Sequence, residues 1–170
     1  MEEIIIRNIN ENDIEAIVDI QISAWKNAYE GIIDQKFLDS MNREERIQKR
    51  KLTYKDSPFI VAEINNEIVG FCRYYYEVIS KDGDDYDCEI MALYVKPELK
   101  GNGIGKTLIN HVKNDMKKHG KYKMILWCLR DNYASRKFYE KVGGKLIDCE
   151  HYAEFGGKQY SEVGFGYDLD

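Results

Sequence analysis

Proline and long apolar runs are scarce in this 170-residue chain, and its 25 basic residues are fewer than its 30 acidic ones. The net charge is −5, so nucleic-acid binding, which depends on basic surface, is not expected. The longest apolar runs, such as Met124–Cys128, cover a few residues and fall far short of a membrane span. The start Met1–Ile4 is acidic, whereas a secretory signal would be basic. We therefore expect a cytoplasmic protein that binds neither nucleic acid nor a membrane.

The cysteines and histidines also lack the spacings of a disulfide framework or a metal site. No C-x-x-C pair occurs, and the cysteines fall in predicted strands, so we expect free, buried thiols. They are Cys72, Cys88, Cys128 and Cys149. No H-E-x-x-H or other ligand spacing occurs, so we expect no metal.

The chain shows no repeat, low-complexity tract or linker, and we expect one domain over residues 1–170. In the first half, apolar spacing predicts a strand, three helices and a hairpin. The strand is Glu3–Ile9; the helices carry Ile14 to Tyr29 (capped by Asn10 or Asn12 and closed by Gly31), Asp34–Ser40 and Asn42–Tyr54; the hairpin joins Phe59–Ile64 to Glu67–Val78 through Asn65 and Asn66.

The second half alternates between strands and helices. Tyr86–Val95 is apolar on both alternating sets, which predicts a central strand covered on both faces and ended by Pro97. The remaining expected elements are a helix at Ile104–Lys118, a strand at Lys123–Leu129, a helix at Asp131–Val142 and a strand pair at Lys145–Tyr152 and Gln159–Tyr167. This order predicts an α/β fold with a mixed sheet.

Three alternate glycines, Gly101, Gly103 and Gly105, stand where the central strand turns into a helix. Glycine lets the backbone approach a ligand closely, and a helix start offers unpaired N–H groups and a positive dipole end. This arrangement favours a pyrophosphate site, the alternative being a flexible turn. Neither G-x-x-x-x-G-K-[ST] nor G-x-G-x-x-G is present, so a P-loop and a dinucleotide fold are set aside.

The segment Glu89–Lys106 resembles the acyl-CoA-binding core of the GNAT superfamily of N-acetyltransferases. Lys100–Gly105 is similar to its [RQ]-x-x-G-x-[GA] loop, with Lys100 in place of Arg or Gln. That departure should cost little, because the loop binds mainly through backbone amides. A second family signature, N-x-x-[SA]-x-x-F-Y-x-x-x-G, matches at Asn132, Ser135, Phe138, Tyr139 and Gly143. The order of elements agrees over nearly the whole chain.

The resemblance implies a GNAT-like fold, a mixed and mostly antiparallel central sheet flanked by helices. In the family, a bulge in the central strand and its divergence from the next strand open a cleft for the pantetheine arm. Acetyl-CoA is then expected to bind along Leu93, Tyr94, Val95, Lys100, Gly101, Asn102, Gly103, Ile104, Gly105, Lys106, Asn132 and Ser135. Asn132 has an alternative role as a helix N-cap.

The resemblance makes Tyr139 the general acid toward the coenzyme A sulfur, the alternative being an aromatic packed beside Phe138. Glu89 is the leading base, acting through a water, and Asp87 is the reserve on the same face. Alternation places Glu89 on the side of Met91 and Leu93 unless a bulge intervenes. The alternative for Glu89 is an exposed or lysine-paired carboxylate at a strand end.

Aromatic residues and one histidine are candidates for the acceptor side. Trp25 is expected to be core, whereas one alternation set of the three consecutive tyrosines is available for the acceptor pocket. The candidates are Trp25, Tyr29, Phe37, Tyr74, Tyr75, Tyr76, His151 and Tyr152.

The predicted function is acetyl-CoA-dependent N-acetyl transfer to a primary amine by a monomer or homodimer. No cysteine has a recognisable histidine partner, which favours direct transfer in a ternary complex over an acyl-cysteine enzyme. The alternatives are a non-catalytic acyl-CoA sensor and an enzyme for another acyl-CoA. The acceptor stays open among polyamines, antibiotic amines, amino acids and protein N-termini.

Overall fold

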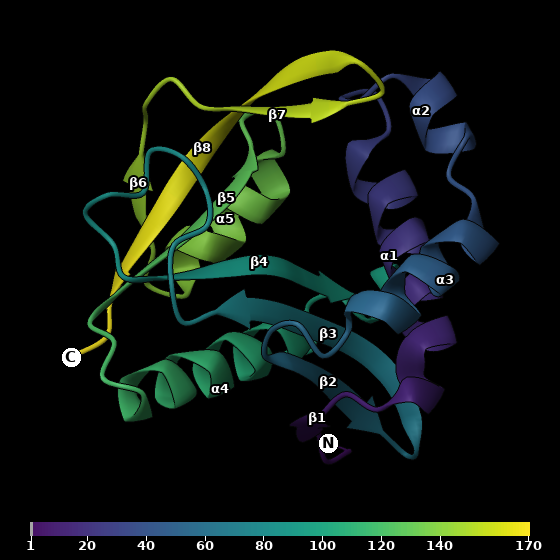
Figure 1. Cartoon of the computed structure of the whole chain (residues 1–170), viewed down its shortest axis with the longest axis horizontal. Coiled ribbons are helices and arrows are strands. Elements are labelled where there is room, and N and C mark those ends of the chain that lie inside the picture. Colours follow the sequence, from purple (N-terminus) through teal and green to yellow (C-terminus); the bar gives the residue numbers. More distant parts are fainter. Residues whose placement is uncertain (1) are drawn as a thin grey trace.

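The computed structural model describes residues 2–170, and in this part of the chain eight strands form a mixed, mostly antiparallel sheet (Figure 1). The strand order is β1-β2-β3-β4-β5-β8-β6, with β7 paired to β8. The strands are β1 (Ile5–Asn8), β2 (Phe59–Ile64), β3 (Glu67–Tyr75), β4 (Cys88–Val95), β5 (Lys123–Leu129), β6 (Lys145–Ile147), β7 (Tyr152–Phe155) and β8 (Lys158–Asp168). The predicted fold class is confirmed.

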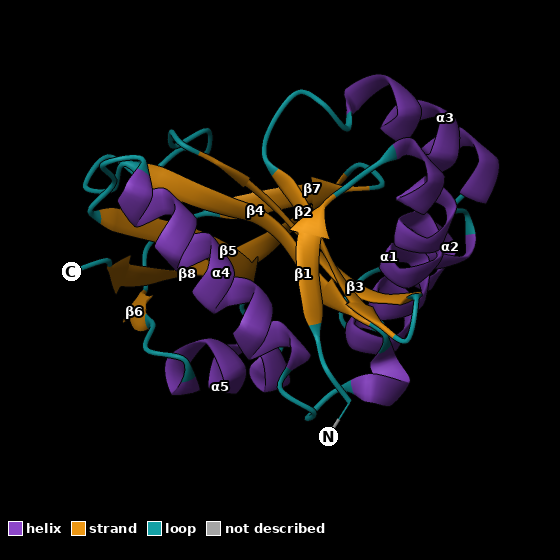
Figure 2. Ribbon diagram, turned by 90° about the horizontal axis from the view of Figure 1, so that it is seen from below, coloured by secondary structure: helices purple, strands orange, loops and turns teal. Residues whose placement is uncertain are grey.

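Helices cover the two faces of this sheet. They are α1 (Ile14–Tyr29), α2 (Gln35–Asp39), α3 (Arg43–Thr53), α4 (Ile104–Lys118) and α5 (Tyr133–Lys141), with short 3₁₀ turns η1 (Glu11–Asp13) and η2 (Pro97–Leu99). Figure 2 shows α4 and α5 on one side of the sheet and α1, α2 and α3 on the other. None of the helices described between residues 2 and 170 is long and apolar enough to cross a membrane.

The apolar stripes predicted from sequence are what attach the helices to the sheet. Ile17 and Ile20 of α1 pack with Phe59 and Phe71 on one face. On the other face, the stripe of α4 is fully buried against Cys72, Ile90 and Phe165. Burial of such side chains is worth about 1.5–3 kcal/mol each, which is the main force that holds the layers together.

The hairpin prediction is confirmed, although its second strand is shorter than expected. Asn65 and Asn66 have φ of 51° and 63°, the left-handed conformation that a two-residue hairpin turn requires. The second strand, β3, ends at Tyr75 rather than Val78.

β4 is central, as predicted, but the expectation that both of its faces are covered throughout is wrong. It pairs antiparallel with β3 and parallel with β5, and the β5 pairing runs over the three residues Cys88–Ile90. Beyond Ile90 the two strands diverge, and Met91 is 57% exposed. The apolar pattern of Met91–Val95 therefore lines an opening rather than a closed core.

A bulge at Met91 also changes which side chains share a face. Arg73 pairs with Ala92 and Tyr74 with Ile90, so Met91 has no partner on β3. Because Met91 is an extra residue, Glu89 shares its face with Ala92 and not with Leu93, which packs on the α4 side. The alternation that placed Glu89 beside Leu93 is overturned by this bulge.

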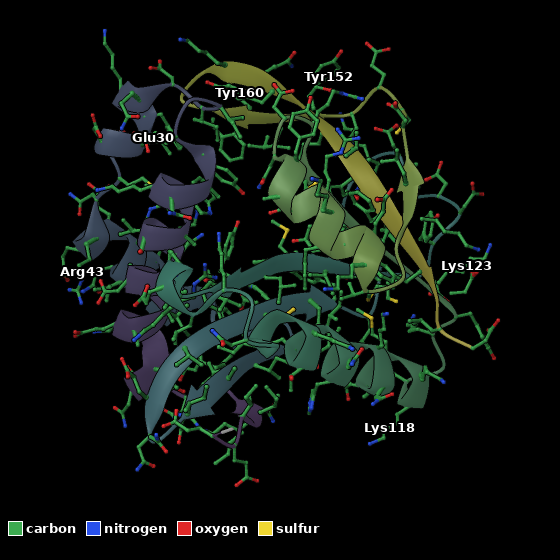
Figure 3. All side chains as sticks on the ribbon, turned by 180° about the vertical axis from the view of Figure 1, so that it is seen from behind. Glu30, Arg43, Lys118, Lys123, Tyr152 and Tyr160 are labelled. Atoms are coloured by element: carbon green, nitrogen blue, oxygen red, sulfur yellow. The ribbon has the colours of Figure 1, made fainter. Side chains whose placement is uncertain are left out.

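The strand predicted at Lys145–Tyr152 is divided into β6 and β7. Both pair with β8, β6 opposite Gly164–Gly166 and β7 opposite Lys158–Ser161. Between them, residues 148–151 leave the sheet, although the His151 carbonyl still accepts the Glu162 N–H at 2.9 Å. β7 and the start of β8 form a hairpin. Figure 3 shows Tyr152 and Tyr160 on this hairpin, far from Lys118 at the end of α4.

Candidate active site

A cavity of about 580 Å³ lies where β4 and β5 diverge. It is lined from both faces of the sheet. Tyr139 and Asn132 reach it from α5, while Glu89 and Trp127 reach it from the α1 face. The bulge and the divergence predicted from the family resemblance are therefore both present, and they create an opening that passes between the two helical layers.

Asn132 caps α5, as one of its two predicted roles requires. Its Oδ1 accepts the Ser135 N–H at 3.3 Å, and the residue is 8% exposed. The side-chain NH₂ group still has two donor hydrogens, so capping does not exclude a contact with a ligand in the cavity. Ser135 also lines the cavity.

Tyr139 points from α5 into the cavity and packs against Phe138 and Phe165, with ring centroids 5.4 and 5.6 Å apart. Burial raises the pKa of Tyr139 well above its ordinary value, and neighbouring groups such as Cys128 and Tyr94 add to this effect. The phenol is therefore protonated at neutral pH. Tyr139 therefore packs beside Phe138, which is one of its two predicted roles. It also lines the cavity, where a proton donor would have to lie.

Glu89 is a buried carboxylate held by the loop that precedes β4. It is 3% exposed, and its Oε2 accepts the N–H groups of Ile79 and Ser80, both at 3.0 Å. The alternative of an exposed carboxylate is excluded, and within residues 2–170 no lysine or arginine forms an ion pair with it. Ser80 Oγ in turn accepts the Trp127 Nε1–H at 2.9 Å, which ties the loop to β5.

Glu162 of β8 is a second carboxylate of the cavity, and sequence reasoning missed it. Burial raises the pKa of Glu162, His151 lowers it, and the nearby charge of Glu89 raises it further. Its Oε1 lies 3.5 Å from Nε2 of His151. A charged residue directly before the apolar run Val163–Tyr167 was the available signal.

Some of the residues predicted for the acceptor side line the cavity, and others do not. His151, Trp25 and Tyr29 line it, so Trp25 is more than a core residue. Trp25 packs with Phe37 and Phe155, at centroid distances of 6.3 and 5.2 Å. Phe155 also lines the cavity, whereas Phe37 lies behind these rings and does not line it.

The remaining candidates lie elsewhere. Asp87, the reserve base, accepts backbone N–H groups of Tyr122 and Lys123 at the start of β5 and does not line the cavity. Tyr74 and Tyr76 both donate to Asp115 on the α4 face. Tyr75, opposite Glu89, and Tyr152, which is 50% exposed, are not among the cavity residues either.

The glycine loop continues from the β4 end of the cavity. Gly101 and Gly103 have φ of 84° and 82°, and a Cβ at either would meet nothing within 4 Å. Gly105 has a different role, because a Cβ there would lie 3.0 Å from Phe138 Cζ. Helix α4 begins at Ile104, so the first N–H groups of the helix have no partner within it. This open cradle of donors fits a pyrophosphate group.

The structure therefore brings most, but not all, of the predicted site residues to one cavity. Those that line it are Glu89, Leu93, Tyr94, Val95, Lys100, Asn132, Ser135 and Tyr139. The loop residues Gly101, Asn102, Gly103, Ile104, Gly105 and Lys106 lie beyond its rim. Among the described residues, no group of three His, Cys, Asp or Glu side chains is placed to hold a metal ion.

None of the cysteines is placed as a nucleophile. All four are free, and Cys128 is the one that lines the cavity. Burial raises the pKa of the Cys128 thiol to about 12, so the reactive thiolate is scarce at neutral pH.

Known proteins resemble this chain over most of its length. The model of the acetyltransferase (GNAT) family matches residues 15–144. A spermidine N(1)-acetyltransferase of Thermoplasma acidophilum is 30% identical over 153 residues, which are 85% of this chain and 90% of that protein. The uncharacterized N-acetyltransferase YuaI of Bacillus subtilis is 25% identical over 162 residues, 95% of this chain and 91% of that protein.

Solved structures share the fold. The PaiA N-acetyltransferase of T. acidophilum in complex with coenzyme A has a TM-score of 0.74 at 27% identity, covering 97% of this chain and 99% of that chain. The protein yncA of Salmonella typhimurium, solved with acetyl-CoA, has a TM-score of 0.68 at 20% identity, covering 98% of this chain and 94% of that chain.

Proposed function

Because this chain belongs to the GNAT family of acetyltransferases, we propose that it transfers the acetyl group of acetyl-CoA directly to a primary amine. One observation carries the proposal: at the divergence of β4 and β5, a protonated phenol and a buried carboxylate line the same cavity. The phenol belongs to Tyr139 and the carboxylate to Glu89. An acyl-CoA sensor would need neither group, which favours an enzyme over a sensor.

Acetyl-CoA fits the opening beside β4. Beyond Ile90 the β5 edge of β4 is free of strand pairing, so the backbone of Leu93–Val95 is available to the pantetheine arm. The backbone N–H groups of Gly101–Lys106 would hold the pyrophosphate, with the donors of α4 aimed at it. The similar PaiA structure was solved with coenzyme A, which supports this assignment.

The proposed chemistry divides proton transfer between the two faces of the sheet. Glu89, through a water, takes a proton from the incoming ammonium, and the free amine attacks the thioester carbonyl. Tyr139 donates its proton to the departing sulfur, and the second proton lost by the acylated nitrogen restores the phenol. Its raised pKa keeps that proton in place until the thiolate forms.

For the acceptor, we propose a polyamine. Glu89, Glu154 and Glu162 line the cavity, and carboxylates around a cleft attract cations. The similar T. acidophilum protein is a spermidine N(1)-acetyltransferase, which supports the same acceptor class.

A second acceptor class, an amine that also carries a carboxylate, is favoured by one observation. Arg46 and Arg50 of α3 stack on Trp25 and Phe59, both at 5.3 Å, and neither has an acidic partner within residues 2–170. Burial and the nearby guanidiniums of Arg73 and Arg46 lower the pKa of Arg50. Neither arginine lines the cavity, but Arg46 lies over the cavity residue Trp25 and is the one that would pair with an acidic group of the acceptor.

One experiment separates these acceptors. Thiol release from acetyl-CoA is measured with spermidine, a diamine, a set of α-amino acids and a peptide with a free N-terminus, and the best amine is retested with propionyl-CoA and succinyl-CoA. We expect the highest kcat/KM with spermidine and acetyl-CoA. Preference for an amino acid would favour the arginine-based class, and no release with any amine would refute acetyl transfer.

A further inference from the structure

His151 is held between two carboxylates with its ring plane fixed. The imidazole lies flat on the indole of Trp127, with ring centroids 3.7 Å apart and planes 10° from parallel. Nδ1 lies 3.0 Å from Oδ2 of Asp82, and Nε2 lies 3.5 Å from Oε1 of Glu162. Because the stacking fixes the ring plane, each nitrogen faces one carboxylate.

These three groups lead from the cavity to solvent. Glu162 and His151 line the cavity, and their side chains are 16% and 10% exposed. Asp82 lies on the loop before β4, outside the cavity, and its side chain is 48% exposed. A buried carboxylate, a buried imidazole and a half-exposed carboxylate are thus in contact in that order.

The proposed reaction produces one proton in the cavity, and this proton has to leave the cavity for solvent. An alkylammonium and acetyl-CoA give an N-alkylacetamide, coenzyme A thiol and H⁺. The carbonyl C–N bond forms and the C–S bond breaks. The nitrogen loses two protons in total, of which one ends on sulfur and the other has to reach solvent in every turnover.

We propose that Glu162, His151 and Asp82 form a relay that carries this proton from the cavity to solvent. The inference rests on the proposed function, since without amine acylation no proton is produced. Glu162 receives, through water in the cavity, the proton that Glu89 has taken up. Nε2 of His151 takes it from Glu162, and the Nδ1 hydrogen passes to Asp82 and then to water. The hydrogen then lies on Nε2. Once the products have left and water has entered the cavity, loss of that hydrogen to water and uptake of another on Nδ1 restore the starting tautomer.

The surroundings of Glu162, the first group of the relay, favour its holding a proton. Burial raises the pKa of Glu162 above that of an ordinary carboxyl group, so it holds a proton more readily than an exposed glutamate does. Glu89 of β4 raises the pKa of Glu162 further. The other ionisable groups that face the relay are Tyr94 of β4, Tyr29 of α1, Cys128 of β5 and, beside Asp82, Cys149.

His151→Phe tests the relay, because phenylalanine keeps the flat stacking on Trp127 and removes both nitrogens. We expect kcat near neutral pH to fall about 10²-fold, the lower end for a lost proton-transfer group, with KM for acetyl-CoA unchanged. Increasing imidazole buffer should restore the rate, since a dissolved base then carries the proton. Wild-type kcat should not depend on buffer concentration.

His119→Phe is the matched control. His119 also stacks on an aromatic ring, Tyr76 at 4.1 Å, and lies 3.6 Å from a carboxylate oxygen of Asp115, but on the α4 face away from the cavity. We expect its kcat and its buffer dependence to equal those of wild type.

Asp82→Asn is a second variant that keeps an acceptor for the Nδ1 hydrogen but cannot take up the proton. Asp82 is half exposed, so the fold should tolerate the change. We expect a lower kcat that buffer restores. If both variants turn over at the wild-type rate, or lose rate that no buffer restores, the relay is refuted and His151 has a structural role. Wild type inactive with every amine would instead refute the proposed function.

Discussion

Replacing Glu89 by glutamine and by alanine separates its two roles, a base for the acceptor and an anchor for the loop before β4. Oε2 accepts both loop N–H groups, from Ile79 and Ser80. In Glu89→Gln the amide oxygen can take the same position, so the anchor stays and the negative charge is lost. In Glu89→Ala both the anchor and the charge are lost.

The structure sets the expected cost of losing the anchor. A buried donor left without a partner costs about 1–3 kcal/mol. Ile79 is 45% exposed, so water can reach this loop, and the lower end of that range applies to each of the two donors. Glu89→Ala should therefore lose about 2 kcal/mol of unfolding free energy, or about 4–8 °C in Tm for a chain of this size.

Catalysis should respond differently from stability. Removing a general base typically costs about 10²–10⁴-fold in rate, so kcat should fall by that factor in both variants. Thiol release with the best amine gives kcat, and a thermal scan gives Tm. We expect Glu89→Gln to stay within a few degrees of the wild-type Tm.

Two outcomes would contradict this reasoning. A Glu89→Gln variant with wild-type kcat would show that Glu89 anchors the loop and is not the base. A Glu89→Ala variant as stable as Glu89→Gln would show that the two hydrogen bonds do not hold the loop in place.

Three further predictions test other parts of the site. Tyr139→Phe keeps the packing and removes the proton donor, so kcat should fall by up to about 10²-fold while acetyl-CoA affinity by calorimetry stays the same; a wild-type rate would leave Tyr139 a packing residue. Gly103→Val should weaken acetyl-CoA binding, whereas Gly120→Val, equally strained at φ 73° but at the other end of α4, should not; equal losses would point to strain alone. Because burial raises the folded-state pKa of Glu162 above its ordinary 4.5, its contribution to stability is present at low pH and lost as pH rises through that pKa. Glu162→Gln should therefore gain Tm over wild type near pH 8 but not near pH 4, and a gain independent of pH would refute the assignment.

Local patterns in the sequence predicted most of the helices and strands and several of the residues that line the cavity. The helix at Ile104–Lys118 was predicted to the residue because its stripe repeats at helical spacing and Gly103 and Gly120 bound it. The hairpin turn and the glycine loop were equally visible, since both need backbone conformations that few residue types adopt. The family motifs drew attention to Tyr139 and Glu89 from adjacent residues alone.

The tertiary structure decided which side chains meet. Whether β4 and β5 stay paired depends on the bulge at Met91 and on how the helices pack on the two faces of the sheet. Neither the bulge nor this packing can be predicted from the apolar periodicity of a single strand. For the same reason, the sequence pattern left open on which face Glu89 lies, and Glu162 went unnoticed. His151 meets Asp82 and Glu162 only because residues 148–151 leave the sheet, a departure set by long-range pairing with β8 rather than by local preference.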